Sequence, residues 1–242
     1  MTPARHLLRL LAAVLLLASA AGTPVRAGEP FDSWRAGTAV TAAQIAAQGG
    51  ADACFAAERV GEALLARISG RSYKAGCPLP VSELRYLKVL HYGLDGKVRL
   101  GEMLCNRAIA ADLLEIFRAL YDARYPIERM VLIDDYEADD NRSMEANNSS
   151  SFNYRTVSGR TTLSRHATGM AVDINPLYNP YIYTRNGRTV VEPASGLPYA
   201  DRTGDFPCKI DAEDLCCRLF KAHGFRWGGD WKSVKDYQHF EK

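Results

Sequence analysis

Two short segments, far apart in the chain, constrain its fold more than any other feature. The first contains His166 and Asp173, and the second places Asp236 and His239 close to the C-terminus. Two imidazoles and one carboxylate are a ligand set that zinc accepts, and three protein ligands leave the fourth position for water. To share one ion, the donor atoms must lie a few ångströms apart. The fold must then bring the end of the chain against a turn in its middle.

The spacing inside the first segment predicts that turn. An extended span would separate His166 from Asp173 by roughly 23 Å, and a helix would still separate them by roughly 10 Å along its axis. The chain must therefore double back, and Gly169 between them permits such a turn. Asp236 and His239 are three residues apart, an offset that points to opposite faces of a regular strand. We expect Asp236 in the turn that enters the last strand and only His239 on that strand.

Residues 1–27 have the pattern of a secretory signal peptide. A positive stretch with Arg5 and Arg9 precedes an apolar run over 10–21, and small residues follow up to Ala27. The apolar run is too short to cross a hydrocarbon core, which needs about 20 residues. No later stretch of the sequence is long and apolar enough to do so. We therefore expect export to the periplasm or the extracellular space, with no stable membrane insertion after signal cleavage.

The composition is that of an ordinary globular protein. Hydrophobic residues make up 47% and charged residues 24%, which excludes a disordered chain, a coiled coil and a multi-span membrane protein. The excess of 30 Lys and Arg over 28 Asp and Glu comes from the leader. The mature chain is close to neutral and gives no reason to propose nucleic-acid binding. All six cysteines follow the leader, so structural disulfides are preferred over a thiolate metal site, with the pairing left open.

Hydrophobic periodicity gives a coarse secondary structure. Helices are predicted over 51–68, 82–93, 106–124 and 211–223. Short strands are predicted over 130–133, 170–174, 225–227 and 237–241. Between them lie a long polar loop over 134–151 and an irregular, proline-containing stretch over 175–207. Helices that come first and strands that come later indicate an α+β fold. Residues 28–64 are interpreted as a partly helical lead-in, and His91 and His223 as solvated surface histidines.

The two chemical segments resemble the signature of the peptidase M15 family, zinc peptidases of the D-alanyl-D-alanine carboxypeptidase and L-alanyl-D-glutamate endopeptidase type. Residues 164–173 match Ser-x-His-x-x-Gly-x-Ala-x-Asp, and 236–239 match the downstream Asp/Glu-x-x-His. The flanks 224–231 and 152–155 are also similar, so the likeness covers about residues 65–242, the expected catalytic domain. It implies a compact α+β fold of the Hedgehog and D,D-peptidase type, with a small antiparallel sheet carrying the zinc site and helices packed on one side.

The resemblance also assigns roles. It implies that three residues hold one zinc ion: His166, Asp173 and His239. Asp236 matches the acidic general base that takes a proton from the attacking water and passes it to the leaving amine. A cation is expected to stabilise the oxyanion or hold a substrate carboxylate, with Arg155 as the candidate and Arg142 as its rival. Ser164 has no base partner and is not interpreted as a nucleophile. Trp227 and Trp231 are expected to shape the wall beside the metal, with core packing as the alternative for Trp227.

The implied function is that of an exported zinc metallopeptidase. Its substrates would be the stem peptides of peptidoglycan, in which it would hydrolyse an amide bond as a monomer, and the flanking segments favour endopeptidase over D,D-carboxypeptidase cleavage. The alternative is a non-catalytic zinc-containing domain that binds the cell wall or a partner protein. The base position and all three ligand positions are filled in this sequence, which counts against that alternative.

Overall fold

The computed structural model describes residues 30–31, 33–157 and 161–242. The predicted signal peptide therefore lies outside the described residues. The helices are α1 (Ala42–Ala47), α2 (Glu62–Ile68), α3 (Ala110–Asp122), α4 (Asp140–Glu145) and α5 (Leu215–Ala222). The strands are β1 (Ala39–Val40), β2 (Ala56–Arg59), β3 (Leu84–Tyr92), β4 (Val98–Asn106), β5 (Ala171–Asp173), β6 (Tyr181–Arg185), β7 (Arg188–Glu192), β8 (Arg226–Trp227), β9 (Lys235–Asp236) and β10 (His239–Glu241). In the described part of the chain, no helix combines the length and the apolar character that a membrane crossing requires.

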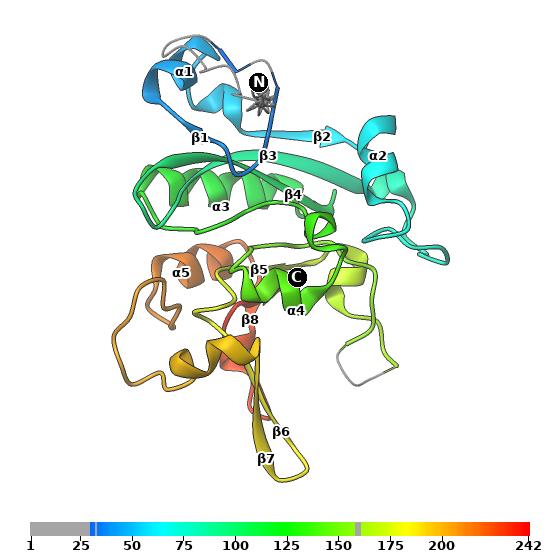
Figure 1. Cartoon of the computed structure of the whole chain (residues 1–242), viewed down its shortest axis with the longest axis vertical. Helices are drawn as coiled ribbons and strands as arrows, with labels where there is room; N and C mark the ends of the chain where they lie inside the picture. The colour runs from blue at the N-terminus through cyan, green and yellow to red at the C-terminus, as the bar shows by residue number, and fades with distance from the viewer. Residues whose placement is uncertain (1–29, 32, 158–160) are drawn as a thin grey trace, which may run out of the picture.

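The fold is α+β, as predicted, with small antiparallel sheets and short helices. The largest sheet has four strands in the order β1-β4-β3-β2. Its centre is the long hairpin of β3 and β4, paired from Leu84 opposite Asn106 to Tyr92 opposite Val98. Figure 1 shows this sheet towards one end of the molecule and the β6–β7 hairpin projecting from the opposite end.

The prediction of a helix over 82–93 is wrong, because that segment forms β3. Leu84 and Leu90 lie on one face of the strand, and Leu87 and Val89 lie on the other. All four side chains are buried, in clusters on opposite sides of the sheet. Leucines spaced three apart therefore reflect a strand that is buried on both faces and not the single apolar face of a helix.

The helix predicted over 51–68 forms only in its second half, as α2. The earlier residues form β2, which pairs with β3 from Ala56 opposite Lys88 to Arg59 opposite Arg85. Pairing with β3, a strand that comes later in the chain, has overridden the local helical pattern. The lead-in segment thus contributes strands to the main sheet.

The helix predicted over 106–124 is confirmed as α3, and its apolar stripe is the centre of the core. The stripe residues are all buried: Ile109, Leu113, Ile116, Phe117 and Leu120. They share one cluster with β3 and β4 on one side and with α5, β5 and β10 on the other. The ring of Phe220 in α5 stacks on Phe240 in β10, with centroids 4.2 Å apart. This packing fixes the second sheet, in the order β5-β10-β8, against the helices.

The stretch 175–207 is more regular than predicted, because β6 and β7 form a hairpin within it. Asn186 and Gly187 make the turn with φ angles of 52° and 73°, the conformation that an Asn-Gly hairpin turn requires. The predicted loop 134–151 contains α4. Three residues of the predicted strand 130–133 are buried, Met130, Leu132 and Ile133, but the segment forms no named strand. The carbonyl of Met130 accepts a backbone hydrogen bond from Glu102 of β4.

The predicted disulfides and surface histidines also need revision. All six cysteines are free in the structure, and four of them are buried: Cys54, Cys105, Cys216 and Cys217. The expectation of structural bridges is therefore not confirmed. His91 is buried in β3, so its interpretation as a solvated residue is wrong. His223 stays partly exposed and lies 3.5 Å from the carboxylate of Asp112.

Candidate metal centre

His166 is positioned by a tight turn around a short 3-10 helix, η4 (Arg165–Thr168). The Ser164 hydroxyl accepts a hydrogen bond from the backbone N–H of His166 and caps this helix. Gly169 ends it with a φ of +66°, and an added Cβ there would lie 2.6 Å from the backbone nitrogen of Asn106. The predicted doubling back at Gly169 is confirmed. The His166 Nδ1 atom lies 2.6 Å from the carbonyl oxygen of Ser151, which leaves Nε2 facing the other two side chains.

Asp173 and His239 meet across the second sheet. Asp173 ends β5, His239 begins β10, and the two residues lie directly opposite each other in the antiparallel pair. Directly opposite side chains share one face of a sheet. The backbone of Ser150 pairs with that of Asp173, so the polar segment that precedes the turn helps to hold the end of β5. The last strand of the chain is thereby placed against the mid-chain turn.

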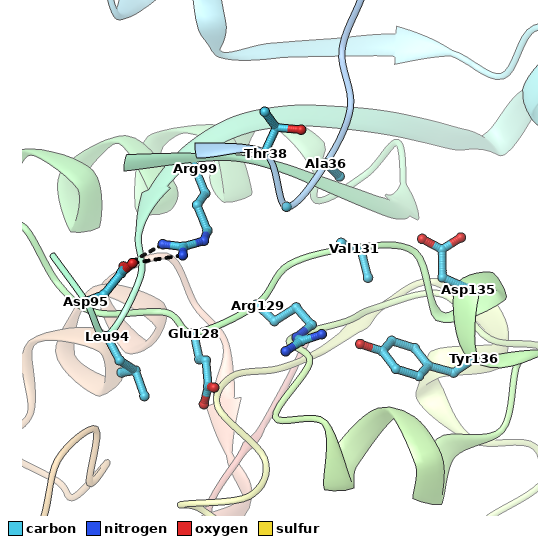
Figure 2. A pocket seen from close by; sticks show the side chains of 11 residues that line it. Ala36, Thr38, Leu94, Asp95, Arg99, Glu128, Arg129, Val131, Asp135 and Tyr136 are labelled. Carbon is cyan, nitrogen blue, oxygen red and sulfur yellow. Dashed lines mark hydrogen bonds and ion pairs between the residues drawn. The ribbon is translucent and has the colours of Figure 1, made fainter. Parts of the chain in front are cut away.

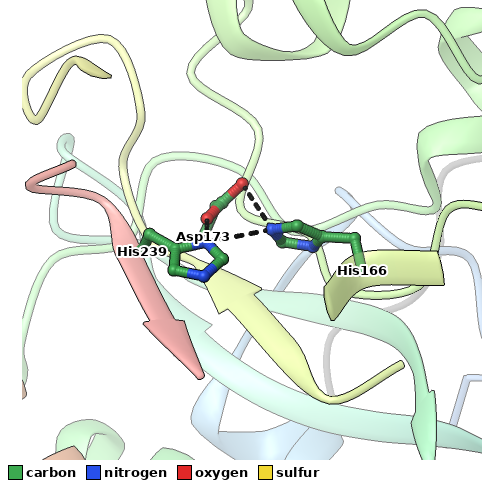
Figure 3. A group of neighbouring side chains, drawn as sticks. All are labelled: His166, Asp173 and His239. Atoms are coloured by element: carbon green, nitrogen blue, oxygen red, sulfur yellow. Dashed lines mark hydrogen bonds and ion pairs between the residues drawn. The ribbon is translucent and has the colours of Figure 1, made fainter. Parts of the chain in front are cut away.

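The three side chains converge from three separate elements (Figure 3). His166 Nε2 lies 3.2 Å from Asp173 Oδ2 and 3.2 Å from His239 Nδ1. His239 Nδ1 lies 3.1 Å from Asp173 Oδ1. Ligand atoms about 2.0–2.1 Å from a tetrahedral zinc ion are roughly 3.3 Å from one another. The separations therefore fit a zinc ion. Among the residues that the structure describes, this is the one group of three such side chains with donor atoms within 4.8 Å of one another.

The electrostatics of this group favour a bound positive charge. Burial alone would raise the pKa of the Asp173 carboxyl, but the imidazoles of His166 and His239 outweigh burial and hold that pKa well below its usual range. Burial alone would lower the pKa of His239, but hydrogen bonds to Asp173 and Glu241 raise it to about 10. Carboxylates beside buried imidazoles stabilise a cation in the pocket, whether proton or metal.

Asp236 lies in the same cavity, but the element that carries it differs from the prediction. It belongs to β9, which pairs with β6, whereas His239 belongs to β10 in the other sheet. The expectation that it sits in a turn is therefore wrong. Its Oδ1 atom is buried and has no hydrogen-bond partner among the described residues. Burial raises its pKa to about 7, against the opposing charge of His239. A buried, unpartnered carboxylate oxygen beside three metal-type ligands suits a group that exchanges a proton.

The cavity around these residues measures about 600 Å³. Arg155 lines it and forms an ion pair with Asp140 at the start of α4. Arg142 is not among its lining residues. Arg165 also lines the cavity, although the sequence had not singled it out.

Trp227 and Trp231, both expected in the wall beside the metal, lie in different places. Trp231 lines the cavity, and its ring centroid lies 5.3 Å from that of His239. Trp227 is buried in the core and donates a hydrogen bond to the carbonyl oxygen of Tyr237. Only Trp231 shapes the wall, and core packing describes Trp227. Glu241 is a site residue that sequence reasoning missed, although its place two residues after His239 on a predicted strand was an available signal.

A larger cavity of about 760 Å³ lies between the 36–38 segment and the 128–136 segment. Figure 2 shows Arg99 turned towards Asp95 in its wall, and the two side chains form an ion pair at 2.6 Å. Asp135, also in the wall, pairs with Arg67 at 2.7 Å. No histidine or cysteine lines this cavity. Arg99 and Asp135 are thus each paired with an opposite charge, and the size of the cavity alone indicates no chemistry.

A comparison with known protein families finds a match over the part of the chain that carries these residues. Residues 158–242 match the peptidase M15 family whose description is D-alanyl-D-alanine carboxypeptidase. The match includes His166, Asp173, Asp236 and His239, and it confirms the resemblance inferred from the two motifs. It begins at residue 158, whereas the inferred likeness began at about residue 65. No solved structure matches the chain.

Proposed function

We propose that this chain, with a peptidase M15 segment over residues 158–242, is an exported zinc peptidase that hydrolyses an amide bond in peptidoglycan stem peptides. Three groups would hold the ion: His166 Nε2, the Asp173 carboxylate and His239 Nδ1. The observation that supports this most is the set of separations of 3.1–3.2 Å between their donor atoms, next to a buried carboxylate with no partner for one oxygen.

A zinc ion held by these residues would supply Lewis acidity, which acidifies water and polarises a carbonyl group. Asp236 supplies the proton transfer. Its carboxylate accepts a proton from the attacking water, whose oxygen forms the new bond to the carbonyl carbon. The same proton then passes to the amine nitrogen as the C–N bond breaks. Burial raises the pKa of this carboxyl above its usual range, which suits a group that must accept a proton and return it.

Arg155 supplies a fixed positive charge in the cavity wall. Its ion pair with Asp140 holds the guanidinium in place before substrate binds. A charge that is already oriented stabilises a developing oxyanion without reorganisation, and the same group can hold a carboxylate of a stem peptide. The likeness of segment 224–231 to endopeptidases favours internal cleavage over removal of a terminal D-alanine. The leader over residues 1–27 supports action in the periplasm or outside the cell.

A digest of muropeptides tests the proposal. Purified mature protein is incubated with defined stem peptides, with and without a chelator, and the products are analysed by mass spectrometry. We expect cleavage that the chelator abolishes and that added zinc restores. Product masses separate internal cleavage from loss of a single terminal residue. Stoichiometric zinc with no chelator-sensitive cleavage of any stem peptide would support the non-catalytic binding domain in its place.

A further inference from the structure

The two histidines of the metal centre use different nitrogens. His166 turns Nε2 towards the other ligands, and the backbone carbonyl of Ser151 faces its Nδ1. His239 turns Nδ1 towards Asp173 and His166. Its Nε2 points the other way, to the carboxylate oxygen Oε2 of Glu241 at 3.4 Å. One ligand is thus oriented by a neutral carbonyl and the other by a carboxylate.

Glu241 is held in a fixed place by the sheet. It lies two residues after His239 on β10, so the two side chains share a face. Arg226 of β8 is its direct cross-strand neighbour, and the Arg226 guanidinium bonds the second oxygen, Oε1, at 2.6 Å. The Glu241 side chain is only 13% exposed, against 67% for Arg226. One carboxylate oxygen therefore meets an exposed cation and the other meets the ligand imidazole.

We propose that Glu241 is a positioning residue for the metal ligand His239. Its carboxylate accepts the Nε2–H bond, which selects the tautomer with a free electron pair on Nδ1 and fixes the plane of the ring. A carboxylate in this role also makes the imidazole a stronger donor to a metal. The inference rests on the proposed metal site, and it adds a residue of the cavity wall that would act on the ion through His239.

The competing explanation is a purely structural one, in which Glu241 serves only to pair with Arg226 across the sheet. Two variants separate the explanations. Glu241→Gln removes the charged acceptor and the ion pair, whereas Arg226→Gln removes the ion pair alone. A positioning role affects the metal only in the first variant.

Zinc affinity, measured by competition with a chromophoric chelator, is the main readout. We expect Glu241→Gln to weaken zinc binding about 10- to 100-fold. Arg226→Gln should stay within about threefold of wild type, because exposed ion pairs contribute little. The visible absorption bands of the Co²⁺-loaded protein should shift in Glu241→Gln and remain unchanged in Arg226→Gln. Circular dichroism checks that each variant is folded, and Glu241→Ala replaces Glu241→Gln if the latter does not fold.

Equal effects of the Glu241 and Arg226 variants, or unchanged zinc affinity in both, would overturn the positioning role. These outcomes are distinct from failure of the proposed function. A wild-type protein that binds zinc and cleaves stem peptides, with an unaffected Glu241→Gln variant, refutes the role of Glu241 alone. A wild-type protein that binds no zinc refutes both.

Discussion

Two buried histidines of this molecule have opposite surroundings. His91 in β3 and His239 in β10 are 2% and 6% exposed. His91 Nδ1 bonds the carbonyl oxygen of Ile127 at 2.8 Å, and its Nε2 has no partner among the described residues. Burial lowers its pKa to about 4. Burial acts in the same direction on His239, but Asp173 and Glu241 raise its pKa to about 10.

The difference shows that burial does not by itself make a histidine functional. A buried imidazole whose hydrogen-bond partner is a carbonyl oxygen stays neutral and behaves as a core residue. A buried imidazole between carboxylates lies where a positive charge is stabilised. The larger cavity has no such arrangement, because no histidine lines it and its Arg99 is paired with Asp95. Carboxylates placed to stabilise a positive charge, more than the burial of a side chain or the volume of a cavity, mark the candidate site.

The largest expected effect comes from removing His239, one of the three proposed zinc ligands. His239→Ala should lose bound zinc and all detectable peptidase activity, because two remaining ligands bind zinc weakly. His91→Gln, which removes the other buried histidine, should keep about one zinc per chain and its activity. Metal analysis of the purified, folded variants measures both. Stoichiometric zinc in His239→Ala would remove His239 from the ligand set.

The next effect separates proton transfer from metal binding. Asp236→Asn keeps the shape of the side chain but cannot accept a proton, so kcat should fall about 10²- to 10⁴-fold while zinc is retained. Asp230→Asn is the matched control, since Asp230 is exposed and pairs with Lys221, and its kcat should not change. Turnover by Asp236→Asn at the wild-type rate would exclude Asp236 from the mechanism.

The convergence of His166, Asp173 and His239 was predictable, because residues that are to share one ion must lie together. His166 and Asp173 could share an ion only through a turn, and Gly169 was the residue between them that could make one. The periodic helix α3 was equally clear, since its stripe faces a single core. Both predictions rest on relations between residues that are close in sequence or that one ion would join.

The errors arose where distant parts of the chain decide local structure. The leucines of β3 mimic a helical face because the strand is covered on both sides. Glu241 stands two residues after His239 on the predicted strand, a local signal that was not used, whereas its pairing with Arg226 of β8 depends on a distant segment. The β6–β7 hairpin is a different case, because Asn186-Gly187 between β-branched and aromatic residues was a local signal that the proline content of the segment obscured.

A smaller effect is expected for the cation in the cavity wall. Arg155→Gln should lower kcat about 10²-fold with zinc retained, as when one preorganised oxyanion donor is removed. Arg142→Gln should leave kcat unchanged, because Arg142 does not line the cavity. Steady-state kinetics on the same stem peptide compares the two. A loss in Arg142→Gln that equals or exceeds the loss in Arg155→Gln would reverse their assignment.

The last prediction concerns stability at low pH, where the smallest effect on activity is expected. It checks the comparison of His91 with His239 directly. The pKa of His91 is about 4 in the folded chain and 6.5 in its ordinary state, so the unfolded chain binds more protons between these values. The neutral His91 therefore contributes fully above pH 6.5, and its contribution is lost as the pH falls towards 4. The loss amounts to about 3 kcal/mol in the free energy of unfolding.

Urea unfolding of wild type and His91→Gln at several pH values measures this loss. The variant should show a shallower decline between pH 6.5 and 4, because it lacks the titrating group. Parallel declines in the two proteins would mean that His91 is protonated in the folded state as readily as in the unfolded one, and its contrast with His239 would disappear.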